Sequence, residues 1–126
     1  MPLVQIALAP LRPDPGSWSD ARLTVAWLGH ATVLLNMTGT WLLTDPALER
    51  RIGIGRGLAK LGPRRLTQPA LRASELPHLD VVLLSHAHMD HTDLGTLRRI
   101  QASTPVVVQR GNQDLVRRFP QVHELA

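Results

Sequence analysis

The stretch DVVLLSHAHMDH, residues 80–91, decides the fold. Its first half is an unbroken apolar run, which is typical of a strand buried on both faces. The polar turn that follows holds three of the chain's six histidines. Side chains at alternate positions leave an extended segment on the same side. The alternating set is His86, His88 and Asp90, and His91 falls where the chain bends and can approach the same space from another direction.

Neutral imidazole and carboxylate groups are ligands for zinc and other borderline divalent metals. The carboxyl end of a buried strand is also where α/β sheets place their ligands. The alternative is a polar surface turn whose histidines occur by chance. From the chain's own His and Asp frequencies, such a pattern arises in about one chain in a thousand. We therefore predict a metal site built on these four residues.

The flanking sequence predicts an α/β domain. Short apolar runs at 23–29, 32–37 and 40–45 are separated by Gly-His and Thr-Gly, which predicts an antiparallel meander. After the histidine turn we expect a helix over 92–103, a buried strand over 105–109 and a short capped helix over 112–119. Strand, helix and strand form a βαβ unit, whose two strands are parallel with a right-handed crossover.

Length and composition indicate one domain. The 126 residues provide one modest core, with residues 1–20 as an irregular lead-in and 21–126 as the folded part. The absence of cysteine excludes disulfides and thiolate metal sites and fits a reducing compartment, so we expect a cytoplasmic protein. We expect neither a signal peptide nor a membrane-spanning segment, although peripheral membrane contact stays open.

The net charge of +4 comes from arginines, many of them in a long loop over 46–77. Two readings stay open for this loop: a solvated segment, or an electropositive rim that attracts a phosphate-bearing substrate, with Arg64 and Arg65 as contacts. Nucleic acid is disfavoured as a partner because there is no aromatic stacking platform. The Gly53-x-Gly55-x-Gly57 spacing lacks the strand-to-helix context of a nucleotide site. The basic residues of the loop are Arg50, Arg51, Arg56, Lys60, Arg64 and Arg65.

The histidine turn resembles the signature of the metallo-β-lactamase fold superfamily. The stretches WLGHATVLL (27–35), LLTDP (42–46) and GPRRLTQP (62–69) resemble, more narrowly, the branch that contains N-acyl-phosphatidylethanolamine phospholipase D. The ascorbate-6-phosphate lactonases are a cousin group. The resemblance covers about residues 23–125 and implies the N-terminal half of an αββα sandwich.

The resemblance also implies a two-metal hydrolase. His86 and His88 would bind the first ion, Asp90 and His91 the second, and Asp90 would also orient the attacking water. Zn²⁺ is the implied metal, with Mn²⁺ or Fe²⁺ as alternatives. The family's remaining ligands have no counterpart in this chain, so we expect it to be unable to complete the centre alone and to expose the inner face of its sheet.

Two further residues have two readings each. Asp45 is either a turn aspartate before proline or a carboxylate that orients a ligand histidine, and the family match favours the second. His30 is either a surface-turn residue or part of the site wall, and the family match again favours the site. His78 and His123 have no partner at ligand spacing, so we expect them to be structural or solvated.

Three functions remain open at this point. The first is a phosphodiesterase of the phospholipase D type, acting on a small-molecule or phospholipid-like anionic substrate. The second is a sugar-phosphate lactonase. The third is a non-catalytic metal-binding remnant that pairs with another chain. The sequence does not indicate an oligomeric state.

Overall fold

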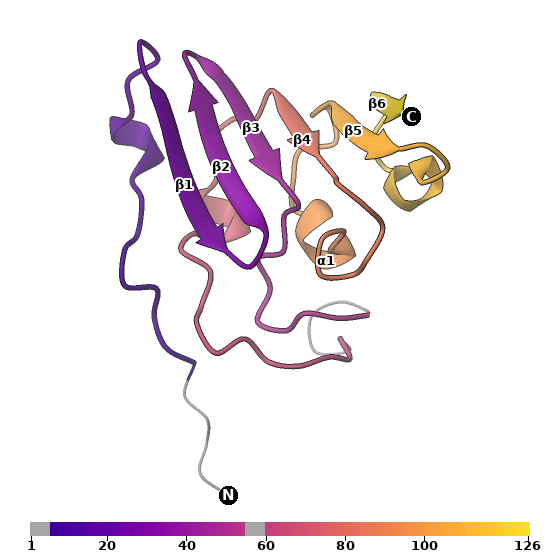
Figure 1. The fold of residues 1–126 in the computed structure, drawn as a ribbon, viewed down its shortest axis with the longest axis horizontal. Coiled ribbons are helices and arrows are strands. Elements are labelled where there is room, and N and C mark those ends of the chain that lie inside the picture. Colours follow the sequence, from indigo (N-terminus) through magenta and orange to yellow (C-terminus); the bar gives the residue numbers. More distant parts are fainter. Residues whose placement is uncertain (1–5, 55–59) are drawn as a thin grey trace, which may run out of the picture.

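The computed structural model describes residues 6–54 and 60–126 (Figure 1). These residues form a six-stranded sheet in which the spatial order of the strands is their order in the chain. The strands are β1 Leu23–Gly29, β2 Thr32–Met37, β3 Thr40–Thr44, β4 Val81–Leu83, β5 Val106–Gln109 and β6 Val122–Leu125. The helical segments are short: η1 Pro15–Ser17, η3 Ala73–Glu75, α1 Leu94–Leu97 and η4 Gln113–Val116.

The first three strands form the predicted antiparallel meander. The β2–β3 turn is Thr38-Gly39, and both residues have positive φ, 49° and 100°. A two-residue hairpin turn of this kind matches the twist of its strands, and glycine is the residue that adopts it without strain. The β1–β2 turn likewise contains Gly29 and His30 at positive φ, 115° and 51°. This second turn places a histidine at the edge of the sheet.

The second half of the sheet is parallel. β4 pairs with β3 and with β5, so the predicted parallel strands of the βαβ unit are confirmed. The predicted helix over 92–103 is too long, because α1 is a single turn followed by bends. Gly95 and Thr96 are weak helix formers. The helix predicted over 112–119 is only the 3₁₀ turn η4, without a side-chain cap.

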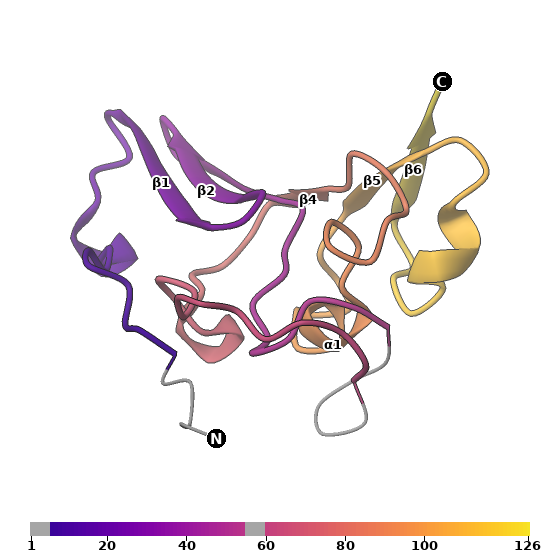
Figure 2. The ribbon, with the colours of Figure 1, turned by 60° about the horizontal axis from the view of Figure 1, so that its bottom comes forward.

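One face of the sheet carries the hydrophobic core. Strand residues on this face are almost fully buried, and they pack against the long loop, α1 and η4. Figure 2 shows these segments together on one side of the sheet. The buried residues of the strands and of the covering segments include Leu28, Leu34, Leu43, Val82, Val106, Leu71, Leu97, Ile100, Val116 and Phe119.

The opposite face is apolar and is not covered by the described residues. On β1, the side chains of Leu23, Val25 and Trp27 are 63%, 56% and 70% exposed. Their cross-strand partners on β2 are Met37, Leu35 and Val33, so the apolar surface continues across the meander. The expectation of an exposed sheet face therefore agrees with the structure.

The described part of the lead-in packs on the domain. Trp18 stacks on Trp41 of β3, with ring centroids 5.5 Å apart and planes 9° apart. Arg12 donates to the Ala70 carbonyl and forms an ion pair with Glu75, at 3.3 and 2.7 Å. Among the described residues, no helix has the length and apolar character needed to cross a membrane.

Candidate metal centre

Three chain segments meet at one edge of the sheet. Thr44 pairs with Leu83 in the parallel β3–β4 ladder, so the residues that follow the two strands lie side by side. The Asp45 N–H donates to the Leu83 carbonyl at 2.9 Å. The β1–β2 turn reaches the same edge because β2 runs antiparallel to β3. The three segments that meet here therefore carry His30, Asp45 and the histidine turn.

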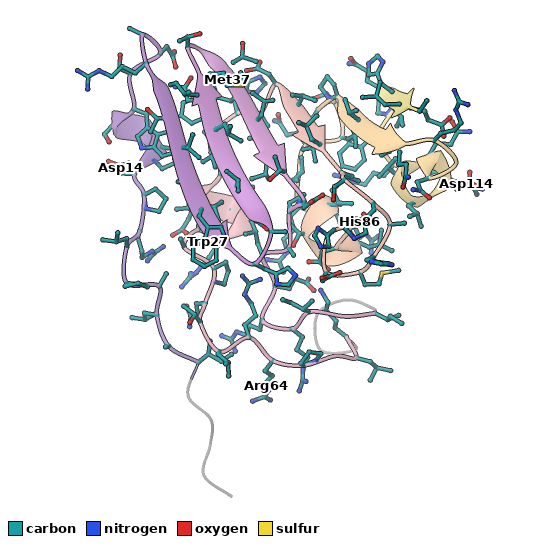
Figure 3. All side chains as sticks on the ribbon, in the orientation of Figure 1. Asp14, Trp27, Met37, Arg64, His86 and Asp114 are labelled. Carbon is teal, nitrogen blue, oxygen red and sulfur yellow. The ribbon has the colours of Figure 1, made fainter. Side chains whose placement is uncertain are left out.

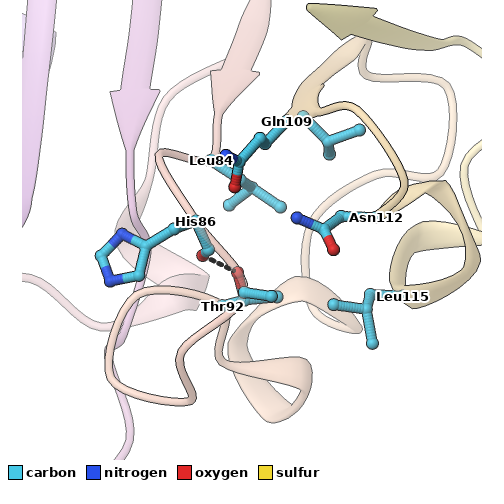
Figure 4. Close-up of a pocket in the computed structure, with 8 residues that line it drawn as sticks. Leu84, His86, Thr92, Gln109, Asn112 and Leu115 are labelled. Carbon is cyan, nitrogen blue, oxygen red and sulfur yellow. Dashed lines mark hydrogen bonds between the residues drawn. The ribbon is translucent and has the colours of Figure 1, made fainter. Parts of the chain in front are cut away.

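The histidine turn is fixed by hydrogen bonds within it. The N–H groups of His91 and Thr92 both donate to the His88 carbonyl, at 2.9 and 2.7 Å. The buried Thr92 hydroxyl donates to the His86 carbonyl at 2.7 Å, as Figure 4 shows. These hydrogen bonds fix the backbone of the turn without using the imidazole rings.

The turn residues form two possible ligand groups. One consists of His86, His88 and Asp90, and the other of His30, Asp90 and His91. In each group, one ligand atom per residue lies within 4.8 Å of the others. Asp90 belongs to both groups, which suits a carboxylate with two oxygens. The structure therefore brings together all four predicted ligands and adds His30 to the second group.

Asp45 lies behind the turn and is 7% exposed. Its Oδ2 is 2.9 Å from Nδ1 of His91, and its Oδ1 accepts from the Ser85 N–H at 2.7 Å. A carboxylate only accepts hydrogen bonds, so the His91 proton lies on Nδ1. In the neutral imidazole, Nε2 of His91, 3.4 Å from Asp90, is then the nitrogen that can bind a metal.

Ser85 is a site residue that the sequence reasoning missed. Its hydroxyl donates to Asp45 Oδ2 at 2.7 Å and lies 2.8 Å from Nδ1 of His86. A hydroxyl has one proton, which goes to the carboxylate, so Nδ1 of His86 must donate to the serine oxygen. In its neutral form His86 therefore also offers Nε2 to a metal. The available signal was the position of Ser85, between the buried strand and the first histidine.

His30 contacts Asp90 directly, with Nε2 2.9 Å from Oδ2. This hydrogen bond is the main reason that the pKa of Asp90 is lowered, so the carboxylate is ionised at neutral pH. His30 and Asp45 both have left-handed backbones, with φ of 51° and 39°. Such conformations are costly for non-glycine residues and tend to occur at functional sites.

The basic loop differs from the expected solvated segment. Lys60 and Arg65 are 3% and 7% exposed, whereas Arg64 is exposed. Arg65 donates to the carbonyls of Ala47 and Thr67, a placement that does not fit a side chain on an open rim. Figure 3 shows Arg64 pointing outward and away from His86. Arg56, Gly55 and Gly57 lie outside the described residues.

The two remaining histidines lie apart from the described site. The side chain of His78 is 74% exposed and is 3.7 Å from Asp80. His123 is exposed on β6. Neither belongs to a ligand group among residues 6–54 and 60–126.

The model of the β-lactamase superfamily domain matches residues 40–125. The chain belongs to the β-lactamase superfamily. The matched segment begins at β3 and includes Asp45, the histidine turn and β6. The matched segment therefore contains the candidate ligand residues of the histidine turn, and His30 lies before it.

Two curated relatives place the chain within the superfamily. It is 36% identical over 89 residues to N-acyl-phosphatidylethanolamine-hydrolyzing phospholipase D 1 of Caenorhabditis elegans, covering 71% of this chain and 24% of that protein. It is 32% identical over 87 residues to a metal-dependent hydrolase of Herpetosiphon aurantiacus, covering 68% of this chain and 30% of that one. The chain therefore spans less than a third of either relative.

A solved structure shows the same fold. An isothiocyanate hydrolase from Delia radicum gut bacteria aligns with a TM-score of 0.66 at 24% identity, over 81% of this chain and 41% of that one. The six-stranded sheet is thus the arrangement found in metallo-β-lactamase-fold hydrolases.

Proposed function

We propose that this chain supplies the metal-binding edge of a metal-dependent phosphodiesterase that acts on an anionic, phosphate-bearing substrate. The observation that carries the proposal is the pair of ligand groups that share Asp90. Support for the substrate class comes from the similarity to a phospholipase D. A small molecule and a phospholipid-like molecule share this phosphodiester chemistry.

The donor atoms fit the proposed metal. The described groups offer imidazole nitrogens and one shared carboxylate, and the chain has no thiolate. This set suits Zn²⁺, and also Mn²⁺ or Fe²⁺, because imidazole and carboxylate bind all three. When bound, such an ion acts as a Lewis acid and lowers the pKa of water.

The chain's own residues would prepare the site in three ways. Asp45 and Ser85 hydrogen-bond to Nδ1 of His91 and His86, so that the neutral form of each histidine offers Nε2 to a metal. His30 orients the Asp90 carboxylate by a hydrogen bond to Oδ2. Arg64 is an exposed cation on the loop and is available to attract an anionic substrate.

We expect the chain alone to bind metal without sustained hydrolysis. Each described ligand group has three residues, and the two groups share Asp90. Most of each relative also lies outside the region that matches this chain. The substrate pocket of the whole protein is therefore not built from these residues alone.

The test is a titration of the metal-free chain with Zn²⁺ and Co²⁺, followed by an assay with bis(p-nitrophenyl) phosphate. Replacing His88 with alanine should weaken binding strongly, because His88 belongs to a ligand group. The matched control is His78→Ala, which removes an exposed histidine outside both groups. Unchanged affinity in His88→Ala, or an equal loss in His78→Ala, would contradict the proposal.

A further inference from the structure

Three residues of the long loop and the N-cap residue of α1 form a group of four buried or nearly buried charges, which we call the buried charge cluster: Glu49, Lys60, Arg65 and Asp93. The side chains of Lys60 and Asp93 are 1% exposed, and that of Glu49 is 12% exposed. Lys60 Nζ donates to Glu49 Oε2 at 3.1 Å and also to Asp93 Oδ1. Two cations balance two carboxylates, which buried charges require.

Lys60 connects the loop to the end of the histidine turn. Its partner Asp93 comes two residues after His91 and caps α1, accepting from the N–H and hydroxyl of Thr96 at 3.3 and 2.5 Å. Thr96 Oγ1 in turn accepts from the Leu48 N–H at 2.8 Å. The chain therefore leaves the histidine turn at a position fixed by contacts with the loop.

Gly95 of α1 lies directly against the same cluster. A Cβ atom there would lie 2.2 Å from Glu49 Oε1, so a larger residue would displace the Glu49 carboxylate. The Glu49 carboxylate therefore packs directly against the first turn of α1. Both carboxylates of the cluster thus contact the segment that follows the histidine turn.

Arg65 connects the loop to the other two site segments. Its Nη1 donates to the Ala47 carbonyl at 2.6 Å, two residues after Asp45. A Cβ atom at Gly29, the residue before His30, would lie 2.6 Å from Arg65 Nη2. Burial lowers the pKa of Arg65, while the charge of Asp93 raises it. One guanidinium therefore packs against the segments that carry His30 and Asp45.

We propose that Lys60 and Arg65 are positioning residues, which hold the three segments of the metal centre in their mutual arrangement from behind the site. This inference rests on the proposed metal-binding function. A role in stability alone explains the cluster less well, because apolar side chains of similar size often stabilise a core as well as buried ion pairs do. Each cation instead contacts backbone or carboxylate groups within two residues of a metal-site residue.

The variants that test this are Lys60→Met and Arg65→Met, which remove the charges and keep much of the volume. Arg118→Met is the matched control. Arg118 donates to the carbonyls of Leu97 and Ile100, at 3.1 and 2.6 Å, and so holds the other end of the α1 segment. If Lys60→Met does not fold, Asp93→Asn replaces it, since it removes the charge that Lys60 contacts while keeping the size of the side chain and an oxygen that can accept from Thr96.

Two measurements are made on each variant. Long-range ¹H–¹⁵N NMR spectra of the metal-free chain report the imidazole tautomers of His86 and His91. A Co²⁺ titration followed by absorption reports affinity and ligand geometry. We expect both cluster variants to change the tautomer signals and to bind Co²⁺ about 10- to 100-fold more weakly, as loss of supporting residues does at metal sites. Arg118→Met should change neither, even where it lowers the urea midpoint as much.

Wild-type tautomer signals and Co²⁺ affinity in both cluster variants would overturn the inference, as would an equal change in Arg118→Met. If the wild-type chain binds no Co²⁺, the proposed function fails. In that case the tautomer signals of the metal-free variants still decide whether Lys60 and Arg65 position the histidines.

Discussion

Nδ1 of His91 lies 2.9 Å from Oδ2 of Asp45, a residue 46 positions earlier in the chain. The contact joins the end of β3 to the turn after β4, and it depends on the parallel pairing of these two strands. Because the carboxylate accepts and never donates, it selects the histidine tautomer that offers Nε2 to a metal. The Asp45 carboxylate thus selects the tautomer of a histidine that is distant in sequence, and the parallel pairing of β3 with β4 brings the two side chains together.

Asp45→Asn should weaken Co²⁺ binding about 10- to 100-fold. The amide keeps the shape of the side chain, but its NH₂ group would face the donors of Ser85 or His91 and lose one of these hydrogen bonds. The affinity is measured by titration of the metal-free protein. Asp114→Asn is the control, because the Asp114 carboxylate is exposed and contacts Arg117. Equal affinities in wild type and Asp45→Asn would show that Asp45 does not orient His91.

His30→Ala should raise the pKa of Asp90 toward its ordinary value, because the hydrogen bond from His30 is the largest cause of the lowering. A lowered carboxyl pKa stabilises the folded state above the ordinary pKa, and this contribution is lost as pH falls through the folded-state pKa. The variant should therefore be less stable than wild type near neutral pH, with the difference vanishing in acid. A ¹³C carboxyl titration of the metal-free chain measures the pKa directly, and an unchanged value would refute the assignment.

Leu34→Ala and Leu35→Ala should differ sharply in stability although they are neighbours on β2. Leu34 is fully buried in the core, so its truncation should cost about 2–5 kcal/mol. Leu35 lies on the uncovered face opposite Val25, which is 56% exposed, so its truncation should cost about 1 kcal/mol or less. Urea unfolding measures both. Equal losses would mean that this face is covered in solution.

Glu75→Gln should lower stability near neutral pH but not in strong acid. The Arg72 N–H and the Arg12 side chain lower the pKa of Glu75, so its ionised form favours the folded state above the ordinary pKa of about 4.3. The contribution is small because the ion pair is exposed, and it is lost as pH falls through the lowered pKa. Urea midpoints of the two proteins should therefore converge in acid, and a constant difference would contradict this account.

The sequence was sufficient to predict the position of the histidine turn and most of the sheet. Alternation along 86–90 and an apolar run before it are local signals, and the structure places these residues at the carboxyl end of β4. The meander was predictable because each of its turns carries a glycine, Gly29 or Gly39, and glycine adopts the positive φ of these turns without strain. In these regions the local pattern and the tertiary environment agree.

The remaining features depend on contacts between distant segments. β6 has little apolar pattern, since Val122 is half-buried and the other three residues are exposed, and it exists because its backbone pairs with β5. For Lys60 and Arg65 the sequence left a solvated loop and an electropositive rim open, because it does not show which carboxylate and carbonyl groups these side chains contact. Ser85 was missed for the same reason, since its role arises only once Asp45 lies beside it.

The consecutive strand order has a consequence for how the protein is made. Each strand pairs only with the strands before and after it in the chain, although the long loop separates β3 from β4. A consecutive order keeps paired strands closer in sequence than a crossed order would, and a smaller separation favours rapid folding. The meander that carries His30 and Asp45 is synthesised before the histidine turn, and its strand β3 is the partner against which β4 then docks that turn.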